Sequence, residues 1–158
     1  MPKITPFLWF DNQAEEAMNF YISIFKNSKV VSVTRNVEGG PGPKGTVLTA
    51  AFELDGQPFT ALNGGPHFKF NEAVSFVVHC QTQSEVDEYW QKLSAGGSEQ
   101  QCGWLKDKYG LSWQVVPTEM PKLLQDKDPA KVGRVMKALM PMKKIDLGKL
   151  KEAYEGRA

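Results

Sequence analysis

The chain is poor in the residues that build disulfide frameworks and metal centres, since its 158 residues include only two cysteines and two histidines. Cys80 and Cys102 lie too far apart to form a metal-binding CxxC pair, so we expect two free thiols and a reducing, cytoplasmic environment. The formal net charge is only +1, from 19 basic and 18 acidic side chains. This balance argues against nucleic acid or a membrane surface as a partner.

Long apolar runs and phosphate-binding motifs are also missing. No stretch reaches the roughly 20 apolar residues that span a bilayer, and the opening segment MPKITPF lacks a signal-peptide core. The glycine-rich tract GGPGPKG, residues 39–45, lacks P-loop spacing, and its prolines remove amide donors. We therefore interpret it as a hairpin connection. No strand–GxGxxG–helix segment points to an adenosyl or dinucleotide site.

The chain does contain an internal repeat. Residues 12–15 read NQAE, and seventy positions later residues 82–85 read TQSE. In this register Gln13 corresponds to Gln83 and Glu15 to Glu85. Each copy follows an apolar run, ITPFLWF or AVSFVVHC, so a strand followed by a helix is predicted twice.

The remaining pattern predicts further strands and short helices. We predict strands over residues 3–10, 29–36, 46–54, 57–63, 73–80 and 111–117, with one or two short strands within 98–107. The first helix is expected to be capped by Asp11 or Asn12, and the second to run from Ser84 to about Ala95. Asp55-Gly56 predicts a two-residue hairpin. The helical segments after Thr118 are too short to be stable alone, so they must pack on their own domain or on a second subunit.

A strand, a helix and three strands, twice over, resemble the paired βαβββ modules of the vicinal oxygen chelate superfamily. The segments ITPFLWFDNQAEEAMNFY, AVSFVVHC, QCGWLKDKYGLSWQVVPT and KVGRVMKALMPMKKIDLGKLKEAY are similar to its PhnB-like branch, which often carries the label 3-demethylubiquinone-9 3-methyltransferase. The resemblance implies an α+β fold with a curved mixed sheet. It implies a glyoxalase-like domain over 1–118, with modules at 1–64 and 73–118, a helical tail at 119–158, and a homodimer.

In the metalloenzymes of this superfamily, four inward-facing residues hold a divalent ion. The residues at the matching positions here are Thr5, Thr60, Ser75 and Gln114. A register slip of one residue would offer Ala61 or Val74, which are no better. Hydroxyls and an amide are poor ligands for a divalent transition metal, so we expect no tightly bound metal and no other cofactor.

The same register predicts a cavity between the modules. Alternation along the strands places one set of side chains inward, and the expected pocket residues are Thr5, Phe7, Trp9, Thr60, Ser75, His79, Trp104 and Gln114. Trp113 should face the opposite way. An aromatic lining with a few polar groups is typical of a site for a small aromatic or amphipathic molecule.

Few residues suggest acid–base or nucleophilic chemistry. His79 could act as an acid or base, or it could be a strand-end histidine satisfied by backbone or solvent. Cys102 could be a reactive thiol in a mobile loop, but no base adjoins it in sequence, which favours an inert thiol. His67 is interpreted as a surface residue. The acids at Glu15 and Glu85 fall in helix first turns, where the helix dipole favours them, and we assign them a structural role.

Three functions remain open. The first is a metal-free protein of this fold that binds a small molecule as a homodimer. The second is an enzyme, either lyase-like, dioxygenase-like or the methyltransferase that the family label names. The third is an interaction module whose amphipathic tail docks a partner. The sequence favours the first, because the expected metal positions carry no histidine or carboxylate.

Overall fold

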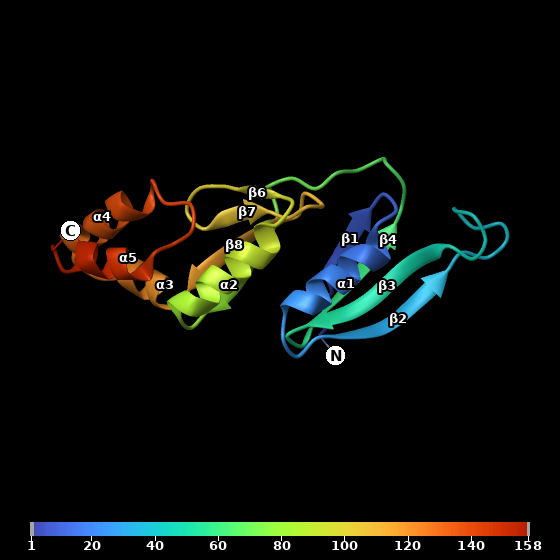
Figure 1. Cartoon of the computed structure of the whole chain (residues 1–158), viewed down its shortest axis with the longest axis horizontal. Helices are drawn as coiled ribbons and strands as arrows, with labels where there is room; N and C mark the ends of the chain where they lie inside the picture. The colour runs from blue at the N-terminus through green and yellow to red at the C-terminus, as the bar shows by residue number, and fades with distance from the viewer. Residues whose placement is uncertain (1, 158) are drawn as a thin grey trace. The chain divides into compact units, whose positions relative to one another are not determined.

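The computed structural model describes residues 2–157 and divides the chain into two compact units, Met1–Phe70 and Asn71–Ala158. Figure 1 shows their elements in chain order. Among the described residues, no helix is long and apolar enough to cross a membrane. The three C-terminal helices group with the second unit, so we describe them with it.

The first unit is one mixed sheet with one helix. Its elements are β1 (Phe7–Phe10), α1 (Ala14–Ile24), β2 (Lys29–Arg35), β3 (Val47–Leu54) and β4 (Gln57–Asn63). The strand order is β1-β4-β3-β2, with β1 parallel to β4 and the other pairs antiparallel. The tract at residues 39–45 lies in the connection between β2 and β3, as predicted.

The second unit repeats this topology and adds the tail. Its elements are β5 (Ser75–Cys80), α2 (Gln83–Ser94), β6 (Ser98–Glu99), β7 (Trp104–Lys106), β8 (Ser112–Pro117), α3 (Glu119–Leu124), α4 (Pro129–Leu139) and α5 (Leu147–Tyr154). The strand order is β5-β8-β7-β6, again with the first strand parallel to the last. Phe7 pairs with Thr60, and Val77, seventy positions after Phe7, pairs with Gln114. The repeated α+β fold is therefore confirmed.

The core of the first unit lies between α1 and one face of its sheet. Ala17, Met18 and Tyr21 of α1 are buried, and so are Phe10 and Phe52 on the sheet. Side chains that alternate with these point to the other face, where Phe7 is 60% exposed. The helix thus covers one face of the sheet and leaves the other open, as the alternation along the first strand predicts.

Turn residues act as expected between β3 and β4. Asp55 and Gly56 have φ values of 48° and 79°, which is the left-handed backbone of a two-residue hairpin. The connection between β2 and β3 closes by two hydrogen bonds, Asn36 N to Thr46 O and Gly45 N to Asn36 O, both 2.8 Å long. Both predicted hairpins are therefore present.

Two local predictions were wrong. The first strand begins at Phe7 rather than at residue 3, because Pro6 has no amide hydrogen to donate to a neighbouring strand. Neither Asp11 nor Asn12 caps α1; Gln13 occupies the N-cap position without a side-chain bond. The cap comes from β4 instead, where Asn63 Oδ1 accepts from Ala14 N at 2.8 Å. Such a tertiary cap cannot be recognised in the local sequence.

The tail packs on the second unit of its own chain. Its core consists of Val135, Leu139, Ile145 and Leu150, and Cys102 from the β6–β7 connection packs against it. The backbone amide of Cys102 donates to Met142 O at 2.7 Å. Of the two docking modes that the sequence left open, packing on its own domain is the one observed in the described residues.

Candidate functional site

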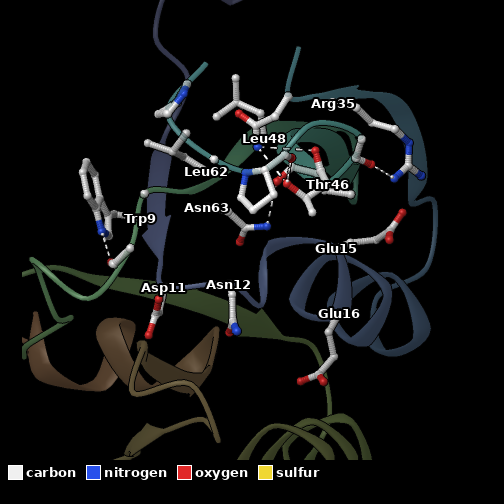
Figure 2. A pocket seen from close by; sticks show the side chains of 18 of the residues that line it. Trp9, Asp11, Asn12, Glu15, Glu16, Arg35, Thr46, Leu48, Leu62 and Asn63 are labelled. Atoms are coloured by element: carbon white, nitrogen blue, oxygen red, sulfur yellow. Dashed lines mark hydrogen bonds between the residues drawn. The ribbon is translucent and has the colours of Figure 1, made fainter. Parts of the chain in front are cut away.

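A pocket of about 940 Å³ lies at one end of the sheet in the first unit. It is lined by the ends of β1 and β4, the N-terminus of α1 and the connection between β2 and β3 (Figure 2). Its volume is in the range of small-molecule sites, roughly 300–1,000 Å³. Within the first unit this concave region brings together charged, amide and aromatic side chains, so we treat it as the candidate site.

The aromatic wall of the pocket is Trp9, which is held in place by its neighbours. Its Nε1 donates to Gly65 O at 2.9 Å, and its ring meets Phe68 edge-on with centroids 4.8 Å apart. A Cβ added at Gly64 would lie only 2.3 Å from the indole, so the ring fits because residue 64 is glycine. The indole is therefore fixed in position before any ligand arrives.

One amide side chain joins three lining elements. Asn63, at the end of β4, accepts from Ala14 N of α1 with its Oδ1 at 2.8 Å. Its Nδ2 donates to Val47 O of β3 at 3.1 Å. Figure 2 shows Asn63 between the helix and the hairpin. Removing this amide would loosen the helix terminus and the hairpin together.

The β2–β3 connection is held by polar contacts of its own. Asn36 is only 7% exposed, and its Nδ2 donates to Thr46 Oγ1 at 3.0 Å. Thr46 Oγ1 donates to Pro43 O at 2.6 Å, and Arg35 donates to Gly45 O at 3.1 Å. Asn36 Oδ1 is buried without a hydrogen-bond partner within residues 2–157, which leaves one acceptor unused in a residue of the lining.

The charged lining is mainly acidic. Asp11, Glu15 and Glu16 contribute three carboxylates against the single guanidinium of Arg35. Figure 2 shows the Glu15 side chain directed towards the hairpin, whereas Glu16 points away from it. Glu15 is half-buried, and its carboxylate makes no hydrogen bond or ion pair with any residue in the described part of the chain. A half-buried carboxylate in this position attracts cations.

Of the eight predicted pocket residues, Trp9 lines this pocket. Phe7 and Thr60 are register partners on the open face of the same sheet. Thr5 precedes β1 and is exposed. Phe7 and Trp9 point to the face of the sheet that the helix does not cover, as predicted. That all eight residues share one ligand site stays a prediction.

The other predicted residues lie in the second unit. Gln114 Nε2 donates to Ser75 Oγ at 2.9 Å, and Trp104 is the register partner of Gln114 on β7. His79 is exposed on β5. Trp113 is buried and donates from its indole to Asp107 at 2.9 Å, so it faces the opposite way from Gln114, as predicted.

The positions that hold metal in the superfamily do not fit a transition metal here. Ser75 and Gln114 are hydrogen-bonded to each other, and Thr5 and Thr60 offer only hydroxyls. Neutral hydroxyls and amides are weak ligands for such ions. In the described part of the chain, no group of three or more histidine, cysteine or acidic side chains is placed to hold a metal ion.

Neither cysteine is an exposed nucleophile. Cys80 is fully buried, and burial, together with the nearby Glu85 carboxylate, raises its pKa to about 12. Cys102 has a left-handed backbone, with φ of 59°, and is partly buried against the tail. Its thiol lies 3.7 Å from Met140 O and 3.8 Å from Leu139 O. The packing of Cys102 under α4 therefore argues against its candidate role as a reactive thiol.

Arg35, Asn63 and Gly64 were not predicted from the sequence as site residues. Arg35 and Asn63 end strands, and Gly64 begins what looks like an ordinary connection. The available signal was the length of the β2–β3 connection, residues 36–46, which far exceeds a two-residue hairpin. Long ordered connections often line binding sites, and that one carries much of this pocket.

Comparison with known proteins agrees with this geometry. The family model described as 3-demethylubiquinone-9 3-methyltransferase matches residues 2–116. A solved PhnB protein from Bacillus cereus with the same label is 43% identical, with a TM-score of 0.69 over 74% of this chain and 100% of that one. Protein PA1353 from Pseudomonas aeruginosa is 19% identical, with a TM-score of 0.62 over 74% of this chain and 98% of that one.

More distant similarity shows the fold alone. The fosfomycin resistance protein FosX from Listeria monocytogenes is 14% identical, with a TM-score of 0.59 over 79% of this chain and 98% of that chain. No protein of curated function matches significantly. Helices α3–α5 begin after residue 116 and lie outside the family match. The family match and the repeated βαβββ topology together show that the chain belongs to the 3-demethylubiquinone-9 3-methyltransferase family, a PhnB-like branch of the vicinal oxygen chelate superfamily.

Proposed function

We propose that this protein binds a small aromatic or amphipathic organic molecule in the pocket of the first unit, without a tightly bound transition metal. The observation that carries the proposal is the fixed indole of Trp9 in a cavity of about 940 Å³ that Leu48 and Leu62 also line. An aromatic ring that is already in position lowers the ordering cost of stacking a ligand on it. The amide and charged groups around it would orient the polar end of the ligand.

The metal-free part of the proposal depends on the chemistry of four side chains. Thr5, Thr60, Ser75 and Gln114 provide three hydroxyls and one amide where the superfamily's metalloenzymes use histidine, glutamine and glutamate. Selectivity for a divalent transition metal requires imidazole, thiolate or carboxylate ligands. The chemistry that polarises vicinal oxygens through such an ion is therefore not the activity we propose.

The activity that the family label names has little support in the strand–helix junctions. Residues 11–13 join β1 to α1, and residues 81–82 join β5 to α2; neither junction contains a glycine. Adenosyl and dinucleotide sites commonly use a glycine-rich turn there, because the backbone must approach the ligand closely. We therefore propose binding rather than methyl transfer.

Native mass spectrometry and elemental analysis of the purified protein test this proposal together. The expected result is less than stoichiometric transition metal, with a retained or added aromatic ligand at one molecule per chain. One equivalent of a first-row metal that survives dialysis against a chelator would overturn the metal-free assignment. Methyl transfer from an adenosyl donor to a demethylated quinone, lost on mutation of the pocket, would overturn the choice of binding over catalysis.

We also propose that the protein forms a homodimer. Phe7 is 60% exposed on the open face of the first sheet, and Ile4, before β1, is 81% exposed; Val74 and Val77 are 63% and 42% exposed in the second unit. Large exposed apolar side chains favour burial by a second copy. Light scattering coupled to gel filtration should give twice the mass of the chain, and a monomer at micromolar concentration would contradict the proposal.

A further inference from the structure

The end of β4 carries a chemically labile pair of residues, Asn63 and Gly64. The chain has six asparagines, and of these only Asn63 is followed by glycine. In an Asn–Gly pair the glycine nitrogen can reach the side-chain carbonyl carbon of the asparagine, because glycine has no side chain to obstruct the approach. Both residues line the pocket of the first unit. A chemical change at this pair would therefore alter the pocket directly.

The contacts of the pocket require both members of the pair. A Cβ at residue 64 would lie 2.3 Å from the indole of Trp9, so this position accepts only glycine while the ring stays in place. Residue 63 accepts from Ala14 N at 2.8 Å and donates to Val47 O at 3.1 Å. An amide side chain can do both, whereas a carboxylate cannot donate. The packing of this site thus imposes the labile pair.

The folded structure holds the reacting groups in bonds that prevent the attack. The amide of Gly64 donates to Phe10 O at 2.9 Å, and it must leave that bond and lose its proton before it can act as a nucleophile. The side-chain amide of Asn63 is held at both ends. Trp9 Nε1 donates to Gly65 O at 2.9 Å, which fixes the next residue as well (Figure 2). Reaction therefore requires the end of β4 to open.

We infer that Asn63 is a site of deamidation, which reacts when the end of β4 detaches from β1 and α1. The nitrogen of Gly64 bonds to Cγ of Asn63, the Cγ–Nδ2 bond breaks, and Nδ2 leaves as ammonia with the proton of the Gly64 amide. Water then opens the cyclic imide on either side of its nitrogen and leaves aspartate or isoaspartate at position 63. The inference concerns the chain itself and does not depend on the proposed ligand.

Either product disturbs contacts that shape the pocket. An aspartate still accepts from Ala14 N at the N-terminus of α1, where negative charge is favourable. It cannot donate to Val47 O, so its second oxygen faces a carbonyl of the hairpin. An isoaspartate lengthens the main chain by a methylene, which displaces Gly65 from the indole of Trp9. Deamidation therefore loosens either the link to the hairpin or the aromatic wall.

Peptide mapping by mass spectrometry of the full chain, aged at pH 8 with and without urea, tests this inference. In the unfolded chain Asn63 should convert fastest of the six asparagines. In the folded chain its conversion should be roughly 100-fold slower, because three hydrogen bonds of the pair must open first. Hydrogen exchange of the Gly64 amide should show protection of similar size, since the same opening controls both reactions.

The variant Trp9→Phe weakens the closed state without changing the pair. It removes the hydrogen bond to Gly65 O, so conversion of Asn63 and exchange of the Gly64 amide should both accelerate by up to about tenfold. Trp104→Phe removes an indole of the second unit and should change neither rate. Exchange of the Phe52 amide in the core of the first unit distinguishes local opening from global unfolding.

Each outcome supports or overturns a stated part of the inference. Conversion of Asn63 at the same rate in the folded and unfolded chain would refute control by the end of β4. Conversion no faster than that of Asn27, an exposed asparagine followed by serine, would refute the assignment of the labile site even in urea. Equal acceleration in Trp9→Phe and Trp104→Phe, or an equal change at the Phe52 amide, would overturn local opening in favour of global unfolding.

Discussion

The substitution Gln83→Met tests whether the two copies of the repeat have taken different structural roles. Gln83 makes two hydrogen bonds with the tail, to Ile145 O at 2.9 Å and from Leu147 N at 2.8 Å. Methionine keeps the length of the side chain but can make neither bond. Since a hydrogen bond contributes about 0.5–1.5 kcal/mol net, the expected loss of stability is about 2 kcal/mol. The half-buried position lets water reach part of the site, which keeps the loss well below that of a fully buried amide.

Two measurements read out this loss. Urea unfolding followed by circular dichroism gives the change in free energy of unfolding by linear extrapolation. Hydrogen exchange then reports the Leu147 amide directly, and its exchange should accelerate about 30-fold if the opening of the tail is favoured by about 2 kcal/mol. The exchange measurement therefore reports the opening of the tail separately from the unfolding of the rest of the chain.

The matched control is Gln13→Met in the first unit. Gln13 matches Gln83 in the sequence repeat, but in the structure it is the N-cap residue of α1, whereas Gln83 is the first residue of α2; its side chain is exposed and makes no cap hydrogen bond. Surface substitutions of this kind usually change stability by less than about 0.5 kcal/mol. The reasoning is refuted if both variants lose the same stability, or if Leu147 exchange is unchanged in Gln83→Met.

Three further predictions concern the pocket, the tail and one thiol. Gly64→Ala places a methyl group within 2.3 Å of the Trp9 ring, so the indole must move; we expect a cost of about 1–3 kcal/mol and a shifted indole signal by NMR. The pKa of Asp87 lies below its ordinary value of 3.8 because of its hydrogen bond with Lys144. The pair therefore stabilises the fold above about pH 4, and this stabilisation is lost as the pH falls through the lowered pKa. Urea unfolding midpoints measured from pH 6 to pH 2 check this prediction. Cys80, whose pKa is about 12 because of burial, should resist iodoacetamide at pH 8 in the folded protein, as peptide mass mapping would show.

Each of these predictions has a control or an opposing outcome. Gly133→Ala, on α4 with open space around it, should stabilise the protein by about 0.5–1 kcal/mol, so a loss similar to that of Gly64→Ala would contradict the steric argument. Asp87→Asn should remove part of the loss of stability in acid, and an unchanged acid profile would argue against the ion pair. Rapid alkylation of Cys80 without unfolding would show that its surroundings open readily.

Much of the fold follows from local pattern. Alternation along the first strand placed Phe10 in the core and Phe7 on the open face, because side chains on a strand alternate between its faces. The Asp55-Gly56 hairpin followed from the left-handed backbone that these residues adopt easily. The repeat set the register that makes Thr60 equivalent to Gln114. These features depend on a few neighbouring residues, which is why the sequence was sufficient.

The site was harder to predict because it depends on contacts between distant segments. Asn63 caps α1 from 49 positions away, and Trp9 donates to Gly65 from 56 positions away. Gln13 and Gln83 look identical in sequence, yet only Gln83 meets the tail. A register identifies equivalent positions but not what packs against each of them. The candidate pocket therefore had to be found in three dimensions.

The short hairpin of the second unit has a consequence for the behaviour of the protein at high concentration. β6 has only two residues, so the amides of Cys102 and Gly103 lie beyond its reach and donate to Met142 and Lys143 instead. Unpaired donors along a sheet edge promote strand addition between molecules. The tail therefore pairs with these two backbone donors and keeps them from bonding to another molecule. A chain lacking it should aggregate through β7 even if every strand of the second unit were still formed.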